Sequence, residues 1–193
     1  MQNFVHLHVH SQYSLLDGQS SIKGMVNKAV ADGMRGMALT DHGNMFGAKE
    51  LYDYCNKINK ERKDNGQEPF KPIFGCEMYV ARSGDKTIRE SKEDQSGWHL
   101  IVLAKNLTGY HNLIKLVSRA WVDGFYMRPR TDHKDLEKYH EGLIVCSACV
   151  AGEIPRKIIQ GKFDEAEEAI QWYKRVFGDD FYLELQRHEV KDP

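Results

Sequence analysis

Three histidines at alternate positions near the start of the chain, His6, His8 and His10, have the types and spacing for metal chemistry. In a β-strand, alternate side chains lie on one face, about 6.6–7 Å apart at Cα. If residues 4–10 form a strand, His8 and His10 are close enough to bind one metal ion or two neighbouring ions. The imidazole pair therefore predicts a metal site, with His6 as an additional candidate ligand.

Further residues of metal-ligand type recur at or near the ends of the other predicted strands. They are Asp17, His42, Glu77, His99 and Cys149, with Asp41 and His188 as additional candidates. Imidazole suits zinc, manganese and iron, whereas carboxylates bridge ions and neutralise their charge. Two or three ions about 3.5–4 Å apart can bind a phosphate and lower the pKa of a bound water. We therefore expect a metal-activated water as the nucleophile, and the sequence contains no convincing serine or cysteine triad.

Several of these residues also have a purely structural interpretation. Asp41, His42 and the following glycine make a good turn sequence, and Cys149 suits a small buried position. Two candidates do not lie at the end of a predicted strand: His99 is at the start of its strand and Glu77 is in the middle of its strand. These alternatives stay open at the level of the sequence.

The elements that would position the candidates alternate between strands and helices. Strands are predicted over 4–10, 37–40, 73–80, 98–104, 143–147 and 181–186. Helices are predicted over 21–32, 46–63, 107–121, 135–139, 154–160 and 164–177. The alternation predicts an α/β fold with a mainly parallel sheet. A doubly wound sheet would have a glycine-rich turn after the first strand, and its absence favours a TIM-like barrel whose strand ends meet at one rim.

Length and composition limit the class of protein. A chain of 193 residues with 41% hydrophobic residues is long enough for one domain with a core. No apolar run approaches a membrane span and no secretory signal is visible, so we expect a cytoplasmic protein without a membrane partner. The net charge of −1 does not favour nucleic-acid binding through a basic surface, so contact with DNA would need positive charge from metal or further protein. The four cysteines do not resemble a disulfide framework.

Three motifs together make the chain similar to the PHP (polymerase and histidinol phosphatase) family. They are His6-Leu7-His8-Val9-His10-Ser11, Tyr13-Ser14-Leu15-Leu16-Asp17-Gly18 and Leu39-Thr40-Asp41-His42-Gly43-Asn44. Within this family, the chain most resembles the PHP domains of bacterial replicative DNA polymerase III alpha subunits. Residues 71–77, 99–106, 108–113 and 141–144 support the narrower resemblance.

The resemblance implies a distorted (β/α)7 barrel, the PHP fold, with up to three metal ions and nine ligands. Seven of these ligands would be His8, His10, Asp17, His42, Glu77, His99 and Cys149, whereas His6 stands where many relatives have aspartate. The family's last two ligands, an aspartate and a histidine on a seventh strand, have no match. We therefore expect residues 1–193 to be a PHP domain that stops before its last strand, as a fragment of a much longer polymerase. The expected ions are zinc or manganese, with magnesium or iron as alternatives.

The resemblance also implies an activity. The full-length protein would be a DNA-directed DNA polymerase, a nucleotidyltransferase of chromosomal replication, with DNA, a proofreading subunit and the sliding clamp as partners. Residues 1–193 alone would not polymerise, and their own site would resemble a metal-dependent 3′→5′ proofreading exonuclease. The alternatives are a stand-alone phosphoesterase of the histidinol-phosphatase type and a non-catalytic, metal-stabilised scaffold that docks replication partners.

Overall fold

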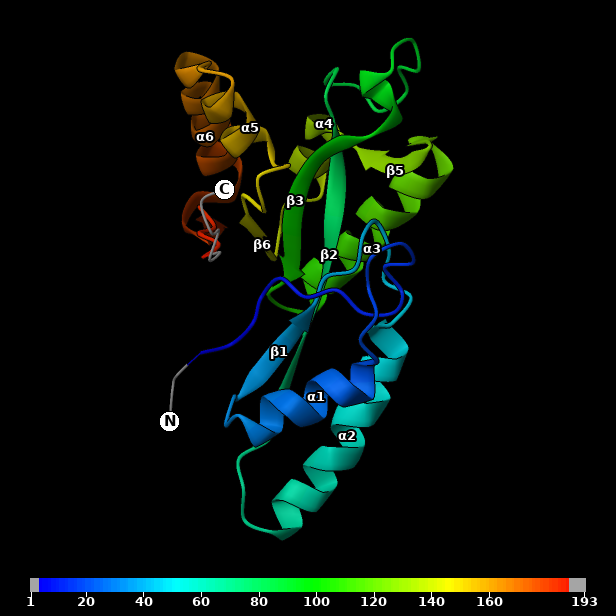
Figure 1. Ribbon diagram of the computed structural model, residues 1–193, viewed down its shortest axis with the longest axis vertical. Helices are drawn as coiled ribbons and strands as arrows, with labels where there is room; N and C mark the ends of the chain where they lie inside the picture. The colour runs from blue at the N-terminus through cyan, green and yellow to red at the C-terminus, as the bar shows by residue number, and fades with distance from the viewer. Residues whose placement is uncertain (1–3, 188–193) are drawn as a thin grey trace, which may run out of the picture.

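Two long antiparallel strands, β2 (Lys71–Ala81) and β3 (Gly97–Ala104), form the centre of the fold in the computed structural model, which describes residues 4–187 (Figure 1). On the other side of β3, β6 (Leu143–Cys146) pairs antiparallel with it, and β7 (Phe181–Tyr182) pairs parallel with β6. The remaining strands extend the sheet beyond β2. They are β1 (Gly36–Leu39) and β5 (Arg128–Thr131), both parallel to β2, and β4 (Phe125–Tyr126), antiparallel to β5. The order is β4-β5-β2-β3-β6-β7, with β1 beside the first part of β2.

The six α-helices of the described chain each bury apolar side chains in the core. They are α1 (Ile22–Ala31), α2 (Ala48–Asp64), α3 (Leu107–Val122), α4 (His133–Lys138), α5 (Glu153–Ile159) and α6 (Phe163–Phe177). Ser21, Asn106 and Asp132 cap three of them, each side chain accepting a hydrogen bond from a backbone N–H of the first turn. Short 3-10 turns cover Glu93–Gln95 and Gly178–Asp180. Within 4–187, no helix combines the length and apolar character needed to cross a membrane.

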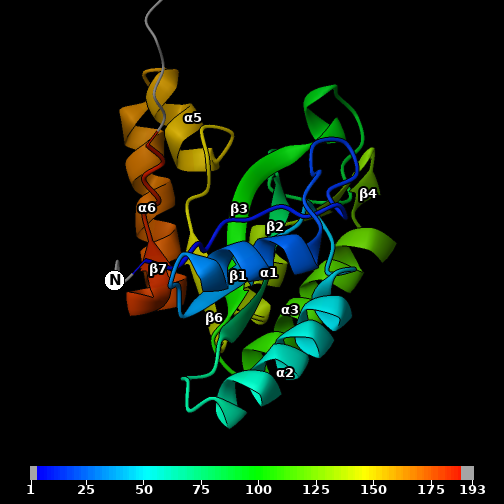
Figure 2. The ribbon, with the colours of Figure 1, turned by 60° about the horizontal axis from the view of Figure 1, so that its bottom comes forward.

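The hydrophobic core has two main parts that lie on either side of the candidate site. The larger packs β2, β3 and β6 against α3 and α6, through residues such as Val102, Leu116 and Tyr173. The smaller packs β1 against α1 and α2, through residues such as Val26 and Leu51. Figure 1 shows α1 and α2 at one end of the molecule, with the N-terminal segment running between them and the region of β6, and both Figures 1 and 2 show α5 and α6 on one side of the sheet's β6 end. The segment is thereby held between two packed bodies.

The predicted α/β class is confirmed, and the curved, mixed sheet fits a distorted barrel. The prediction of a mainly parallel sheet is wrong, because β3 returns directly beside β2. Parallel neighbours need a crossover connection, usually a helix. Residues 82–96 supply only a loop with the short turn Glu93–Gln95, so antiparallel pairing results. The predicted helices all form, whereas the β4–β5 hairpin at 125–131 was not predicted.

Two predicted strands are also corrected. Residues 4–10 are not a regular strand, although Ala38 N–H donates to His6 O and Thr40 N–H donates to Val9 O. The two bonds are three residues apart in the N-terminal segment but two residues apart in the segment that ends β1, so the pairing is not regular. Val9 N–H donates to the Thr40 side chain rather than to a backbone carbonyl. At the other end, the strand predicted over 181–186 pairs with β6 only through Phe181 and Tyr182.

Candidate metal centre

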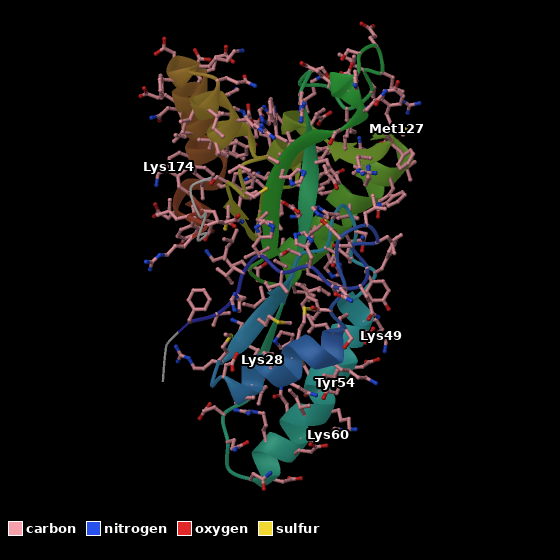
Figure 3. The ribbon with its side chains drawn as sticks, viewed as in Figure 1. Lys28, Lys49, Tyr54, Lys60, Met127 and Lys174 are labelled. Carbon is pink, nitrogen blue, oxygen red and sulfur yellow. The ribbon has the colours of Figure 1, made fainter. Side chains whose placement is uncertain are left out.

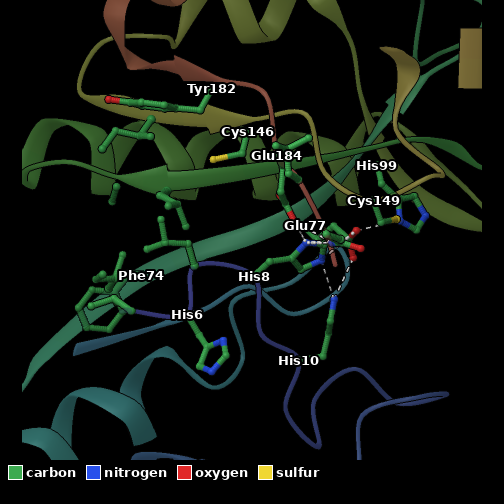
Figure 4. A pocket seen from close by; sticks show the side chains of 18 of the residues that line it. His6, His8, His10, Phe74, Glu77, His99, Cys146, Cys149, Tyr182 and Glu184 are labelled. Atoms are coloured by element: carbon green, nitrogen blue, oxygen red, sulfur yellow. Dashed lines mark hydrogen bonds and ion pairs between the residues drawn. The ribbon is translucent and has the colours of Figure 1, made fainter. Parts of the chain in front are cut away.

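The carboxylate of Glu77, in the middle of β2, is the hub of the candidate site (Figure 4). Four imidazoles from three other parts of the chain converge on it. Its Oε1 lies 3.3 Å from His8 Nε2 and 2.8 Å from His99 Nδ1. Its Oε2 lies 3.2 Å from His10 Nε2 and 2.7 Å from His42 Nδ1. The Glu77 side chain is only 1% exposed, so the carboxylate is surrounded by imidazoles rather than by water.

Each of these side chains reaches the hub from a defined element. His42 lies three residues after the end of β1 and forms an isolated parallel bridge with Glu77, which brings the segment after β1 beside the middle of β2. His99 lies near the start of β3 and is paired with Tyr79. His8 and His10 come from the N-terminal segment, and their Nε2 atoms are 3.1 Å apart. The sequence-based pairing of His8 with His10 is therefore reproduced without a regular strand.

The Glu77 carboxylate and the surrounding imidazoles each favour the charged form of the other. Burial would raise the pKa of Glu77, but hydrogen bonds from the surrounding histidines outweigh it and lower that pKa far below its ordinary value. Burial would lower the pKa of His8, but the Glu184 and Glu77 carboxylates raise it to about 10. The same opposition, with Cys149 and Glu77 as partners, raises the pKa of His99 to about 9. Without metal, the site therefore holds imidazolium groups around an ionised carboxylate.

The arrangement fits a divalent cation on its own geometry. His42 Nδ1 and Glu77 Oε2 are both buried and form an ion pair at 2.7 Å, but the contact does not have the geometry of a good hydrogen bond. Two triads, His8–His10–Glu77 and His42–Glu77–His99, each offer ligand atoms within 4.8 Å of one another. A cation would neutralise the Glu77 carboxylate and would accept the lone pairs of His42 Nδ1 and Glu77 Oε2. The donor set therefore suits one or more shared divalent ions.

Two further predicted ligands lie at the margin of this cluster. Asp17 is more exposed, and its Oδ2 lies 2.9 Å from His42 Nε2. Cys149 follows β6, and its Sγ lies 3.7 Å from His99 Nδ1. Burial raises the pKa of the Cys149 thiol, but the contact with His99 and other partners lowers it on balance. All seven principal candidates are thus in one connected group.

Of the three additional candidates, the two that lie within the described residues, Asp41 and His6, are not in this group. Asp41 is fully buried and accepts hydrogen bonds from Ser11 N–H, from the Ser11 hydroxyl and from the Ser14 hydroxyl, so it holds the loop before Asp17. His6 is exposed and lies edge-on to Phe4, and Figure 4 shows it directed away from Glu77. His188 lies outside the described residues.

Two residues of the site escaped the sequence analysis. Glu184, just after β7, accepts a hydrogen bond from His8 Nδ1 at 2.7 Å. Its polar position in an otherwise apolar stretch, Phe181–Leu185, was the available signal. Ser14 lies 2.9 Å from His10 Nδ1 through its Oγ. Both residues hold one ring nitrogen and leave Nε2 directed at the cluster.

Comparison with known proteins gives a consistent set of matches. Residues 6–188 match the model of the PHP domain. The chain is 51% identical over 189 residues to DNA polymerase III subunit alpha of Borreliella burgdorferi, and 46% identical over 191 residues to that of Treponema pallidum. Each alignment covers 98% of this chain but 16% of the relative, so the chain spans a small part of the length of these proteins. A solved amidohydrolase from Chromobacterium violaceum aligns over 95% of this chain and 85% of that one, with 11% identity and a TM-score of 0.47.

Proposed function

The chain belongs to the PHP domain family, and from this premise we propose that its histidine–glutamate cluster is a divalent-metal centre that hydrolyses phosphodiester bonds. The observation that carries the proposal is the convergence of four imidazoles on the buried Glu77 carboxylate, with the 2.7 Å contact of His42 Nδ1 and Glu77 Oε2 lacking good hydrogen-bond geometry. Such a cluster is costly to maintain without a cation, because buried polar atoms need partners.

The seven principal candidates are the proposed ligands. They are His8, His10, Asp17, His42, Glu77, His99 and Cys149. When bound, divalent ions supply a polarised phosphorus and a water of lowered pKa as the nucleophile. The protein's own part is orientation: Glu184 and Ser14 hold the Nδ1 atoms of His8 and His10, which fixes both rings.

The mixture of donors favours particular ions. Imidazole and thiolate ligands suit zinc, and imidazole with carboxylate also suits manganese or iron. Magnesium is less well matched, since it prefers oxygen ligands and retains several waters. We propose zinc or manganese, with up to three ions when the ligand set is complete.

The parent protein is proposed to be the alpha subunit of a bacterial replicative DNA polymerase, located in the cytoplasm. The named relatives support this over a stand-alone histidinol-phosphatase-like enzyme. Its substrate at this site would be the 3′ end of a DNA strand, hydrolysed in the 3′→5′ direction. A proofreading subunit and the sliding clamp are the proposed protein partners of the whole polymerase.

Hydrolysis of a 3′-mismatched primer in the presence of Mn²⁺ or Zn²⁺ tests the proposal. We expect His42→Ala to reduce the rate at least about a hundredfold, because loss of a ligand exceeds the 10- to 100-fold cost of losing a supporting residue. His111→Ala, which changes an exposed histidine of α3, is the matched control and should leave the rate unchanged. Equal rates in both variants would reject the proposed centre.

A metal-stabilised scaffold without hydrolysis is the second candidate, favoured by the way Glu77 links the N-terminal segment, β1 and β3. Both candidates predict that chelation lowers the melting temperature, since an ion that binds only the folded state stabilises it by about 2.7 kcal/mol at a hundredfold excess over Kd. Only the scaffold predicts stabilisation by metal with no release of nucleotides. Thermal melts and primer hydrolysis on the same metal-loaded sample therefore separate the two.

A further inference from the structure

We propose that three exposed aromatic side chains beside the metal centre, Phe46, Trp121 and Phe125, form a platform on which an unpaired base of single-stranded DNA stacks. We call these three residues the aromatic platform. The inference rests on the proposed function, because it identifies the part of a phosphodiester substrate that lies next to the hydrolysed bond.

The three rings come from separate elements and face solvent together. Phe46 precedes α2, Trp121 lies at the end of α3 and Phe125 begins β4. The rings of Trp121 and Phe125 are 5.4 Å apart and inclined by only 18°, and Phe46 lies 6.2 Å from Trp121. Their exposed fractions are 60% for Phe46, 41% for Trp121 and 44% for Phe125. Packing of the described core therefore leaves much of this aromatic surface uncovered.

The platform is attached to the backbone of the metal centre. Trp121 Nε1–H donates to Gly43 O at 2.8 Å, and Gly43 directly follows the proposed ligand His42. Gly43 has a positive φ of 63°, and a Cβ there would lie 2.6 Å from the Pro129 side chain of β5. The β4–β5 hairpin is thus packed closely on the turn that presents His42. A ligand on the platform is held in a fixed relation to the cluster.

The surroundings favour a nucleotide as the occupant. Arg128 lies beside the platform on β5 and acts electrostatically on Tyr79, whose ring stacks on His42. Its positive charge therefore acts near the stacked Tyr79 and His42 rings, where it would attract the phosphate of a nucleotide. Exposed Met127 at the hairpin tip extends the apolar surface (Figure 3). A nucleotide matches these features, because its base can stack on the flat apolar surface and its phosphate can contact the Arg128 cation and the metal. An apolar protein segment would not make use of the Arg128 charge.

Binding of single-stranded DNA tests the platform separately from hydrolysis. The probe is a fluorescent oligo-dT, compared with the same oligonucleotide carrying abasic residues at its 3′ end, in buffer with Ca²⁺ and without Mn²⁺ or Zn²⁺. Stacking contributes about 1–3 kcal/mol per base, so we expect Phe46→Ala and Phe125→Ala each to weaken oligo-dT binding about fivefold to a hundredfold. Phe163→Ala, which removes an exposed aromatic ring from α6 at the β6–β7 edge of the sheet, far from the β4–β5 hairpin, is the matched control. Neither platform variant should weaken binding of the abasic oligonucleotide.

The result that overturns the platform is equal oligo-dT affinity in the platform variants and the control, or equal losses for the oligo-dT and abasic probes. Wild-type dimers that dissociate on Phe46→Ala, with DNA affinity unchanged, would also overturn it and would assign the surface to a second copy of the chain. Base-dependent binding without any hydrolysis would support the platform while rejecting the proposed activity. If the protein hydrolyses DNA in a His42-dependent way but binds the oligo-dT and abasic probes equally well, the proposed activity is supported and the platform is rejected.

Discussion

Glu77 and His99 lie diagonally across the antiparallel ladder of β2 and β3, with Glu77 Oε1 2.8 Å from His99 Nδ1. Glu77 is opposite Ile101 and His99 is opposite Tyr79, so both side chains are on one face of the sheet. Diagonal neighbours of this kind are within reach of long side chains. Because β3 runs back along β2, a histidine near the start of one strand meets a carboxylate in the middle of the other.

Replacing Glu77 by glutamine should lower the pKa values of the histidines that its carboxylate now raises. The substitution keeps the size of the side chain but removes the charge that supports the imidazolium groups. We expect the pKa of His99 to fall below its value of about 9 in metal-free protein, because burial then acts with one opposing partner fewer. Titration of the histidine ring protons by NMR measures the change.

Glu184→Gln is the matched control for this prediction. Glu184 contacts His8 at 2.7 Å, so its substitution should lower the pKa of His8 from about 10 and leave His99 near its original value. An unchanged pKa of His99 in Glu77→Gln would contradict the role of Glu77 as the hub.

Much of the helical framework and of the ligand set could be predicted from the sequence. Capping residues and apolar periodicity located the helices, as at Ser21 before α1. The types of the side chains at 8, 10, 42, 77 and 99 indicated metal chemistry, and the structure gathers them around one carboxylate. The reason is physical: cap chemistry and ligand chemistry are local properties of the residues.

The pairing of the strands could not be predicted in the same way. The direction of β3 depends on residues 82–96, which form a loop rather than a crossover helix, and this is decided by long-range packing. The same limit explains Glu184, since its contact with His8 spans 176 positions of sequence. The imperfect placement of His99 at the start of its strand was the one visible sign of antiparallel pairing.

Metal affinity should rise with pH, because protons and ions compete for the same imidazoles. The pKa values of about 10 for His8 and about 9 for His99 lie above the ordinary 6.5. A raised pKa in the folded state stabilises metal-free protein fully below pH 6.5, and this contribution is lost as pH rises through 9 to 10. Chelated protein should therefore lose stability over this window while affinity for Zn²⁺ increases.

Thermal melts of chelated protein and competition titrations with a zinc indicator, both between pH 6.5 and 10, measure the two opposite trends. His111→Gln should reproduce the wild-type profiles, since His111 is an exposed histidine of α3. A melting temperature that is flat across the window, together with pH-independent zinc affinity, would exclude the proposed competition.

Asp41 should act as a positioning residue rather than as a ligand. Its carboxylate accepts three hydrogen bonds from Ser11 and Ser14, and the Ser14 hydroxyl in turn contacts His10 Nδ1. Asp41→Asn cannot accept from all three donors, so we expect it to lower the free energy of unfolding by about 1–3 kcal/mol. Denaturant titration measures this loss, with the exposed Asp32→Asn as control.

Metal content distinguishes the two roles of Asp41. If it positions the loop, Asp41→Asn should retain bound metal at saturating concentration, whereas His42→Ala should not. Mass spectrometry of the metal-loaded proteins measures the stoichiometry. Equal loss of metal from both variants would identify Asp41 as a ligand and contradict the observed geometry.

Glu153 should control the stability of the protein in acid. It lies at the start of α5, where Lys157 Nζ is 2.8 Å from its Oε1 and the Tyr173 hydroxyl donates to its Oε2 at 3.1 Å. Burial would raise the pKa of Glu153, but interactions with His133 and Lys157 outweigh it and lower that pKa to about 2. A lowered pKa in the folded state contributes stability above the ordinary value of 4.5, and this is lost as pH falls toward 2.

The lost contribution is at most about 3.5 kcal/mol, at about 1.4 kcal/mol for each unit between the two pKa values. Glu153→Gln should therefore be less stable than wild type at pH 7 and should lose less stability between pH 4.5 and pH 2. Urea unfolding at a series of pH values measures the slope, and Glu165→Gln, which alters a half-exposed ion pair with Lys162, serves as control. A parallel acid slope in Glu153→Gln and wild type would assign the acid sensitivity to other carboxylates.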